Sequence, residues 1–490
     1  MRILSLLVAV ATAMVPYVHN GPTTSIDWHG CEPDLAAIGA RCGELTVPLN
    51  YQDPAGRTIS VALAMRPATD QAHKLGTLVV NTGGPGPSRD GVQAIAGGIP
   101  GFDPGGQPDL AARYDLVGVD PRFFGLSTPL DCGWPTGEYL DSTQLATPDR
   151  ASFDASVTVA KDLAARCAAQ SDLLPYASTR NIARDLDAVR AALGVPRISY
   201  LGWSYGTYLG SVYVQMFPQR VDRIVLDSAW DPRVYGPRQN RDLAGPDDAA
   251  LRDWAGWAAA RDNQYGLGDS VDAVLATVAR IQQAAPLRVG QYQVTADMLP
   301  GLMLTASDDD AAYAEFSDSV AVLRDAAAGK AVTPTGDQAL LLSLFNDNGT
   351  EPAYGFSATV ANQCADRAAP RDLDVYYRDI QRHLAGEPFY GPLFRHVNPC
   401  AFWPATPAEP PTTVANDHPA LIISASGDPA TPYPGQLALH ADLTGSRQLT
   451  LAGAFRHGVY LGSARNACVD DTATNYLLTG TLPATDRTCR

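Results

Sequence analysis

The stretch Gly202-Trp203-Ser204-Tyr205-Gly206 decides the fold of this chain. It has the pattern G-x-S-x-G and joins two elements of different type. Residues 197–201 form a short apolar and β-branched run that predicts a strand, and residues 207–213 predict a buried helix. A tight turn between strand and helix leaves no room for side chains at the two glycines, and it lifts the serine hydroxyl clear of the sheet. We therefore predict that Ser204 is a nucleophile, and not a serine buried in a Gly-rich turn.

The strand before this turn is one of several that alternate with helical segments. Such alternation is typical of a doubly wound, mostly parallel sheet. The apolar runs that predict its strands are residues 76–80, 114–119, 197–201, 221–226, 420–425 and 447–451. Residues 43–49 and 58–65 alternate like early antiparallel strands. With the serine turn in place, this pattern predicts an α/β-hydrolase fold.

The periodicity changes after about residue 234. From there to about residue 395 it is mostly helical, and no strong buried-strand run occurs. We interpret residues 234–395 as a mainly helical cap inserted into the hydrolase core. The core would then consist of residues 14–233 and residues 396–490, the second part carrying the remaining catalytic groups.

The first 13 residues resemble an export signal. Arg2 provides the positive charge, residues 3–13 are apolar, and Ala11-Thr12-Ala13 offers a cleavage site between small residues. The segment is too short to span a bilayer, and we expect a secreted bacterial protein without stable membrane insertion. The net charge of −16 argues against nucleic acid and anionic membrane surfaces as partners.

The chain contains eight cysteines, an even number that favours four disulfides in an oxidising compartment. None of them lies in a C-x-x-C motif, which argues against a zinc site or a redox dithiol. Short loops close most readily. Proximity therefore favours the pairs Cys31–Cys42, Cys132–Cys167, Cys364–Cys400 and Cys468–Cys489.

A serine nucleophile needs a base within hydrogen-bond reach and a third group that orients the base. In α/β-hydrolases these groups follow in the order Ser, acid, His. The histidines that follow Ser204 are His383, His396, His418, His440 and His457. Only His457 comes just after a predicted core strand, and Asp428 follows the strand at 421–425. Open α/β sheets place their chemistry at such strand ends. We predict the triad Ser204, Asp428 and His457.

Acyl transfer also requires donors for the negative charge that develops on the carbonyl oxygen. We expect one donor to be the backbone N–H of Tyr205 and the other to come from Gly83 or Gly84, in the Gly-rich loop after the strand at 76–80. The loop is not a phosphate-binding P-loop, because no Lys-Ser or Lys-Thr follows it. The sequence predicts no cofactor and no metal.

These motifs together resemble the tripeptidyl aminopeptidase family of secreted bacterial serine peptidases, which are related to the prolyl aminopeptidases. The family's N-P-G-G-P-G loop corresponds to residues 81–86, and its G-x-D-P-R-G-x-G-x-S segment to residues 118–127. Its S-Y-G-T-Y-L-G elbow matches residues 204–210, and its D-P-A-T-P segment matches residues 428–432. The resemblance covers nearly all of the mature chain and is loosest in the cap.

The chain departs from the family pattern at four positions. Thr82 replaces a proline, Phe123 and Leu126 replace a glycine and an arginine, and Arg456 replaces the glycine before the catalytic histidine. None of these changes removes an atom of the triad. We expect the last three to alter a pocket wall, and so to affect substrate preference more than reaction class.

The resemblance implies an exopeptidase that releases short peptides, such as tripeptides, from a free N-terminus. We expect the protein to be a monomer. An esterase or amide hydrolase acting on small metabolites would use the same triad, and a non-catalytic binding protein is a third alternative. An aminopeptidase must pair the substrate's α-ammonium group with a carboxylate. The candidate acids in the cap are Asp308, Asp309, Asp310, Asp347, Glu351 and Asp366.

Overall fold

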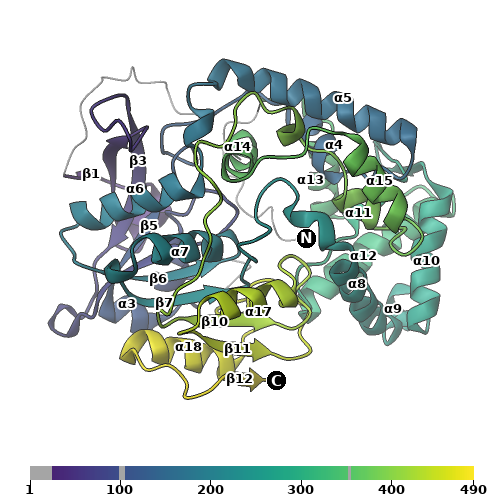
Figure 1. The fold of residues 1–490 in the computed structure, drawn as a ribbon. Helices are drawn as coiled ribbons and strands as arrows, with labels where there is room; N and C mark the ends of the chain where they lie inside the picture. Colours follow the sequence, from purple (N-terminus) through teal and green to yellow (C-terminus); the bar gives the residue numbers. More distant parts are fainter. Residues whose placement is uncertain (1–24, 99–104, 351–354) are drawn as a thin grey trace.

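The computed structural model describes residues 25–98, 105–350 and 355–490. The predicted export signal and the candidate acid Glu351 lie outside these residues. Figure 1 shows a twisted central sheet with helices on both faces and a large helical region beside one end of its strands.

One ten-stranded sheet forms the core, in the order β1-β2-β3-β5-β4-β6-β7-β10-β11-β12. The strands from β5 to β12 in this order are parallel, whereas β1, β2 and β3 are antiparallel to their neighbours. Their bounds are β1 Asp27–His29, β2 Arg41–Pro48, β3 Thr58–Arg66, β4 Gly76–Asn81, β5 Tyr114–Val119, β6 Ile198–Trp203, β7 Val221–Asp227, β10 Leu421–Ala425, β11 Arg447–Leu451 and β12 Arg487–Cys489. The predicted doubly wound sheet is confirmed.

The central strands are apolar because helices cover both of their faces. Every residue of β5, β6 and β10 is buried, as expected for parallel strands between two helical layers. Helices α6 (Thr179–Ala192) and α7 (Tyr205–Met216) pack into one core cluster. On the other face lie α2 (Gly91–Ala96), α3 (Pro108–Arg113) and α18 (Ala467–Thr479), with a second cluster. These layers hold the strand ends in fixed register.

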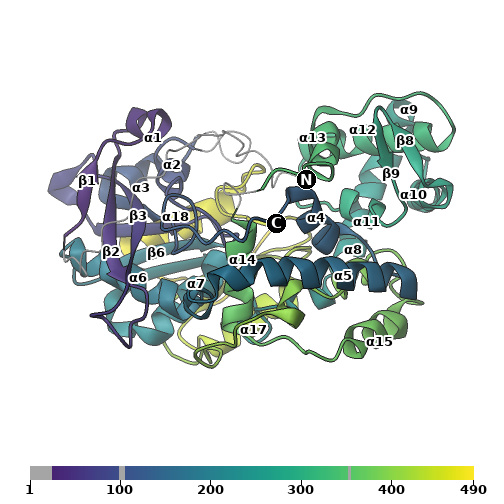
Figure 2. The ribbon, with the colours of Figure 1, turned by 90° about the horizontal axis from the view of Figure 1, so that it is seen from above.

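The helical region between β7 and β10 has its own apolar cluster. Its helices are α8 Ala244–Ala259, α9 Asp262–Tyr265, α10 Val271–Ala284, α11 Leu299–Leu302, α12 Asp310–Ala327, α13 Gly336–Leu344, α14 Phe356–Asp366, α15 Asp374–His383 and α16 Gly391–Phe394. A short hairpin, β8 (Leu287–Val289) and β9 (Tyr292–Val294), is a further element that the helical period did not predict. Figure 2 shows α9, α10, α12 and α13 grouped away from the sheet.

Two segments lie on the side of the molecule opposite to the one expected from the predicted boundary between this helical region and the core. Helix α14 packs in the core cluster of the sheet through Ala358, Val360 and Cys364. Helices α4 (Thr136–Gln144) and α5 (Arg150–Arg166), which come before the predicted cap, lie on its side of the molecule. The backbone N–H of Gly137 at the start of α4 donates to the carbonyl of Asp347. The cap region is therefore attached to the core at several places along the chain.

Four disulfides staple surface segments to this framework, and they are the four pairs that proximity favours. Cys31–Cys42, Cys132–Cys167, Cys364–Cys400 and Cys468–Cys489 have Cα–Cα separations of 5.0, 4.7, 5.3 and 5.8 Å. In the described part of the chain, no helix has the length and apolar character needed to cross a bilayer.

Candidate active site

Ser204 lies at a strained turn between β6 and α7. Its φ of 54° and ψ of −122° fall in a region that non-glycine residues rarely adopt. The flanking glycines are required by close packing. A Cβ at residue 202 would lie 2.5 Å from the carbonyl oxygen of Gly206, and a Cβ at residue 206 would lie 2.7 Å from Oδ1 of Asn81. The turn is therefore held by its two glycines in a conformation that presents the serine.

The sheet brings the three predicted catalytic residues to one edge. Ser204 follows β6, Asp428 follows β10 and His457 follows β11. In the order β6-β7-β10-β11 all four strands are parallel, so their carboxyl ends lie side by side. Nδ1 of His457 is 3.1 Å from both carboxylate oxygens of Asp428. Within the described residues, the hydroxyl of Ser204 has no hydrogen bond to the ring, and such bonds often form only when substrate is bound.

Asp428 is held by hydrogen-bond donors on three sides. It is 1% exposed. Its carboxylate accepts the backbone N–H groups of Ala430 and Thr431 at 2.9 and 3.0 Å, and the Thr431 hydroxyl at 2.7 Å. Nε2 of Gln436 donates at 3.1 Å. These donors fix the direction in which the carboxylate faces His457.

The His457 ring is poised to take up a proton. Burial lowers the pKa of His457, but the charge of Asp428, the hydrogen bond to it and the charge of Asp227 together raise the pKa above its ordinary value. Because Nδ1 faces Asp428, Nε2 is the ring nitrogen left to act on the serine. The side chain is 21% exposed, so a substrate leaving group can reach it.

The Gly-rich loop after β4 passes close to the nucleophile. A Cβ at Gly83, whose φ is 98°, would lie 2.8 Å from the carbonyl oxygen of Trp203 and 3.0 Å from Cβ of Ser204. The Gly83 N–H donates to Oδ1 of Asn81 at 3.1 Å, so a substrate oxyanion would compete with Asn81 for this donor. Tyr205 begins α7, where an N–H has no partner four residues back. The Tyr205 N–H and the loop at Gly83 and Gly84 are the groups that the sequence predicts as oxyanion donors.

The side chain of Tyr205 is locked by a buried polar chain. Its hydroxyl lies 2.9 Å from Oγ1 of Thr179. The Thr179 hydroxyl in turn donates to Asp366, which also accepts the Thr179 N–H at 2.8 Å. Burial raises the pKa of Asp366 to about 7. Asp366, one of the candidate acids for the substrate's ammonium group, therefore accepts hydrogen bonds from Thr179 next to Tyr205.

A segment of the cap, residues 304–309, is fastened to the loop that carries His457. The His457 N–H donates to the Ala306 carbonyl at 3.0 Å, and the Phe455 N–H donates to the Asp308 carboxylate at 2.8 Å. Arg456 forms an ion pair with Asp308 at 2.6 Å. The residue that replaces the family glycine therefore contacts the cap.

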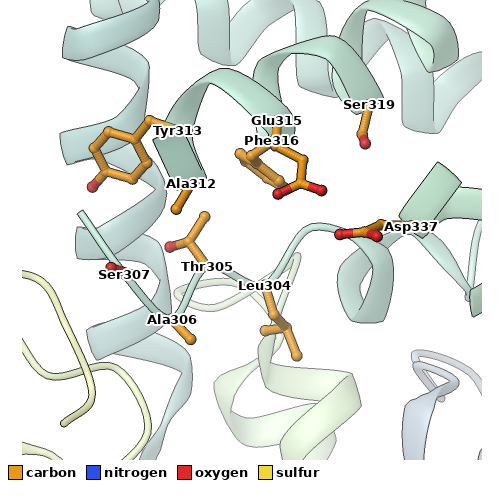
Figure 3. A pocket seen from close by; sticks show the side chains of 10 residues that line it. All are labelled: Leu304, Thr305, Ala306, Ser307, Ala312, Tyr313, Glu315, Phe316, Ser319 and Asp337. Carbon is orange, nitrogen blue, oxygen red and sulfur yellow. The ribbon is translucent and has the colours of Figure 1, made fainter. Parts of the chain in front are cut away.

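Residues 304–307 also line a pocket. Leu304, Thr305 and Ala306 form part of its wall, and helix α12 contributes Glu315 and Phe316. Figure 3 shows the carboxylates of Glu315 and Asp337 facing each other across it. The residues that line the pocket belong to the predicted cap, and none of them is a member of the triad.

Three residues near the triad escaped the sequence reasoning. Asp227 ends a buried strand and looks like a turn former. Thr431 lies in the D-P-A-T-P segment, which gives a local signal for it. Asp247, in the first turn of α8, is 5% exposed, and no hydrogen bond or ion pair is formed by its side chain with the residues that the structure describes.

The sequence is similar to several characterised proteins along nearly its whole length. Residues 387–489 match a family described as TAP-like protein. The tripeptidyl aminopeptidase of Streptomyces lividans is 33% identical over 480 residues, which cover 95% of this chain and 86% of that protein. Serine protease Hip1 of Mycobacterium tuberculosis is 30% identical, with 95% and 91% covered. Carboxylesterase B of the same species is 30% identical, with 94% and 89% covered.

Proposed function

Because this chain belongs to the tripeptidyl aminopeptidase family of α/β-hydrolases, we propose that it is a serine exopeptidase that acts near a free N-terminus. The observation that carries the proposal is the His457–Asp428 pair at 3.1 Å, at the same edge of the sheet as the Ser204 elbow. The names of two relatives, a tripeptidyl aminopeptidase and a serine protease, support peptide substrates.

The arrangement performs acyl transfer in two halves. Nε2 of His457 takes the Ser204 proton as Oγ attacks the scissile carbonyl, and Asp428 stabilises the imidazolium that forms. The N–H of Tyr205 and a donor from the loop at Gly83 and Gly84 hold the oxyanion. His457 then protonates the leaving amine. In the second half, a water molecule attacks the acyl-enzyme with the same base.

The acids predicted to bind the substrate's ammonium group mostly have protein partners. Asp308 pairs with Arg456, and Asp366 accepts bonds from Thr179. Asp309 caps α12 by accepting the Ala312 N–H at 2.8 Å. The other two described candidates, Asp310 and Asp347, contact Trp257 and Gly349. None of these carboxylates needs a ligand for its charge.

Asp247 is a better candidate for the ammonium ligand. It is buried and has no countercharge among the described residues. Burial and then the negative charge of Asp428 raise the pKa of Asp247 well above its ordinary value. The contribution of Asp428 to this pKa supports a position for Asp247 near the triad. An ammonium group bound there would supply the missing countercharge and favour the ionised carboxylate.

Ester hydrolysis is the second candidate function, and the similarity to carboxylesterase B favours it. The same triad cleaves both bonds, so the two activities are separated by substrate and not by mechanism. Two measurements on the wild-type enzyme distinguish them. Labelling by a fluorophosphonate reports the activated serine. Comparison of free and N-acetylated tripeptidyl-coumarin substrates reports the amino group. We expect labelling, and at least about tenfold higher kcat/KM for the free peptide.

Export is part of the proposal as well. The four disulfides are consistent with an oxidising compartment outside the cytosol. Cell fractionation of a bacterium expressing the full chain tests this point. Recovery of the disulfide-bonded enzyme from the culture medium or the cell envelope would support export, and retention in the cytosol would contradict it.

A further inference from the structure

The end of strand β7 connects all three catalytic segments. β7 lies between β6, which leads to the nucleophile, and β10, which leads to the acid. The Ser204 N–H donates to the Asp227 carbonyl at 3.0 Å. The next residue, Ser228, donates its N–H to Ile423 of β10 at 2.9 Å. Two adjacent residues thus touch the strands on both sides.

The side chains of the same two residues hold the loop that follows the catalytic histidine. The Ser228 hydroxyl accepts the Gly458 N–H at 2.8 Å. The Asp227 carboxylate accepts the N–H of Val459 at 3.0 Å and that of Tyr460 at 2.6 Å. Ser228 has a φ of 57°, an unfavourable value for a serine. The three residues directly after His457 are therefore all fixed by the end of β7.

Burial of Asp227 is costly, which makes its presence informative. The residue is fully buried, and among the described residues no arginine or lysine forms an ion pair with it. Burial raises the pKa of Asp227 to about 7, against the effect of its hydrogen bonds and of His457. Carbonyl oxygens would satisfy the same backbone N–H groups without the cost of a buried charge. The carboxylate of Asp227 is attracted most strongly to the His457 ring when that ring becomes an imidazolium.

We propose that Asp227 is a positioning residue for His457. It holds residues 458–460 so that Nε2 faces Ser204, and it adds a second negative charge near the imidazolium formed during the reaction. The other charged groups around His457 are Asp428, on the β10 side, and the Arg456–Asp308 pair, toward the cap. The inference rests on the proposed serine-hydrolase function of this site.

The substitution Asp227→Asn tests the role, with Asp470→Asn as its matched control. Asp470 also accepts a backbone N–H from this loop, that of Leu461 at 3.2 Å, and it pairs with Arg465. Both changes replace a carboxylate by an amide of the same size, but only Asp227 acts on His457 electrostatically. We measure kcat/KM and the fluorophosphonate labelling rate against pH in the wild type and both variants.

We expect Asp227→Asn to lower kcat/KM and the labelling rate by about 10²-fold, the cost of small misplacement of a catalytic group. Loss of a negative charge lowers the pKa of His457, so the acidic limb of the pH profile moves to lower pH. Asp470→Asn leaves that limb in place. A folded Asp227→Asn enzyme with wild-type rates and an unmoved acidic limb would overturn the proposal.

A second variant covers the case in which Asp227→Asn does not fold. Ser228→Ala removes the acceptor for the Gly458 N–H and the hydroxyl that donates to the Asp227 carboxylate at 3.1 Å. We expect a lower kcat with little change in KM, because the loop after His457 loses one of its anchors while the carboxylate of Asp227 is kept. Wild-type kcat in this variant would contradict the positioning role. Failure of the wild-type enzyme to label would instead reject the serine-hydrolase function itself, which keeps the two failures separate.

Discussion

At the scale of single residues, the site requires glycine at three positions, because neighbouring atoms leave no space for a side chain there. The contacts of residues 83, 202 and 206 show that a methyl group at any of them would collide with the elbow or its surroundings. Ser204 itself occupies a backbone conformation that costs about 1–3 kcal/mol. The surrounding strands and helices supply the stability that keeps this strained residue in place.

Replacement of Ser204 by alanine removes the nucleophile and little else. We expect Ser204→Ala to reduce kcat/KM by about 10⁴- to 10⁶-fold, while the melting temperature stays close to that of the wild type. Steady-state kinetics and differential scanning fluorimetry measure the two quantities. Activity within about tenfold of wild type would show that another residue attacks the substrate.

Asp247→Asn tests the binding of the substrate amino group. A charge-assisted hydrogen bond contributes about 1.5–3 kcal/mol. The variant should therefore lose roughly 10- to 100-fold in kcat/KM on peptides with a free N-terminus, and should cleave N-acetylated peptides at the wild-type rate. Asp248→Asn is the control, since Asp248 is 51% exposed and pairs with Arg252. Equal losses on both substrates would assign Asp247 a structural role only.

The candidate triad could be proposed from the sequence because each member has a local signal. Ser204 stands in a pattern of glycines, and Asp428 and His457 follow apolar runs that end at the same edge of a sheet. Asp227 and Asp247 have no such signal. The partners of Asp227 lie more than 200 residues away in sequence, at Val459 and Tyr460. Asp247 is recognised only because its burial leaves it without a countercharge.

At the scale of elements, buried strands were easier to predict than short ones. β6 and β10 are continuous apolar runs because helices cover both faces. β12, β8 and β9 have three residues each, too few for a period to emerge. Tertiary contacts form these short strands, through the pairing of Leu449 with Arg487 in the sheet and of Leu287 with Val294 in the cap.

The cap segment at residues 304–309 should influence catalysis through the histidine loop. Asp308→Ala removes the acceptor for the Phe455 N–H and the ion-pair partner of Arg456, which still donates to the Ala464 carbonyl. We expect kcat to fall severalfold or more, since a small displacement of His457 slows proton transfer, whereas fluorimetry should show a small stability loss. Asp310→Ala, at a site 84% exposed, is the control. Unchanged kcat in both variants would show that the loop holds its position without the cap.

At the scale of the whole molecule, buried carboxyls give stability an unusual dependence on pH. Burial raises the pKa of Asp90, Asp227 and Asp366 to about 7, whereas an aspartic acid in the unfolded chain titrates near 3.9. Between these values the folded protein binds more protons than the unfolded chain. Its free energy of unfolding therefore falls as the pH rises through that interval. The raised pKa of His457 acts in the same direction above pH 6.5. Burial lowers the pKa of His396 and His418, and these two residues oppose the trend below pH 6.5.

We expect the melting temperature to be higher at about pH 5 than at about pH 7.5, at constant ionic strength. Scanning calorimetry across this range measures the effect. Activity should change in the opposite direction, because proton transfer requires a neutral His457. In the variant Asp366→Asn the slope of melting temperature against pH should decrease, since one of the titrating groups is gone. A melting temperature that rises from pH 5 to 7.5 would contradict this assignment of buried carboxyls.

The bonds between residues 304–309 and the histidine loop also limit how this enzyme can be redesigned. In a modular hydrolase, an engineer would exchange the lid to obtain a new specificity and leave turnover untouched. Here the Ala306 carbonyl and the Asp308 carboxylate, both supplied by the cap, help to place the general base. A transplanted or trimmed cap would have to reproduce those two acceptors. A change in the cap will therefore alter substrate selectivity and turnover rate together, so that selection for one of them will constrain the other.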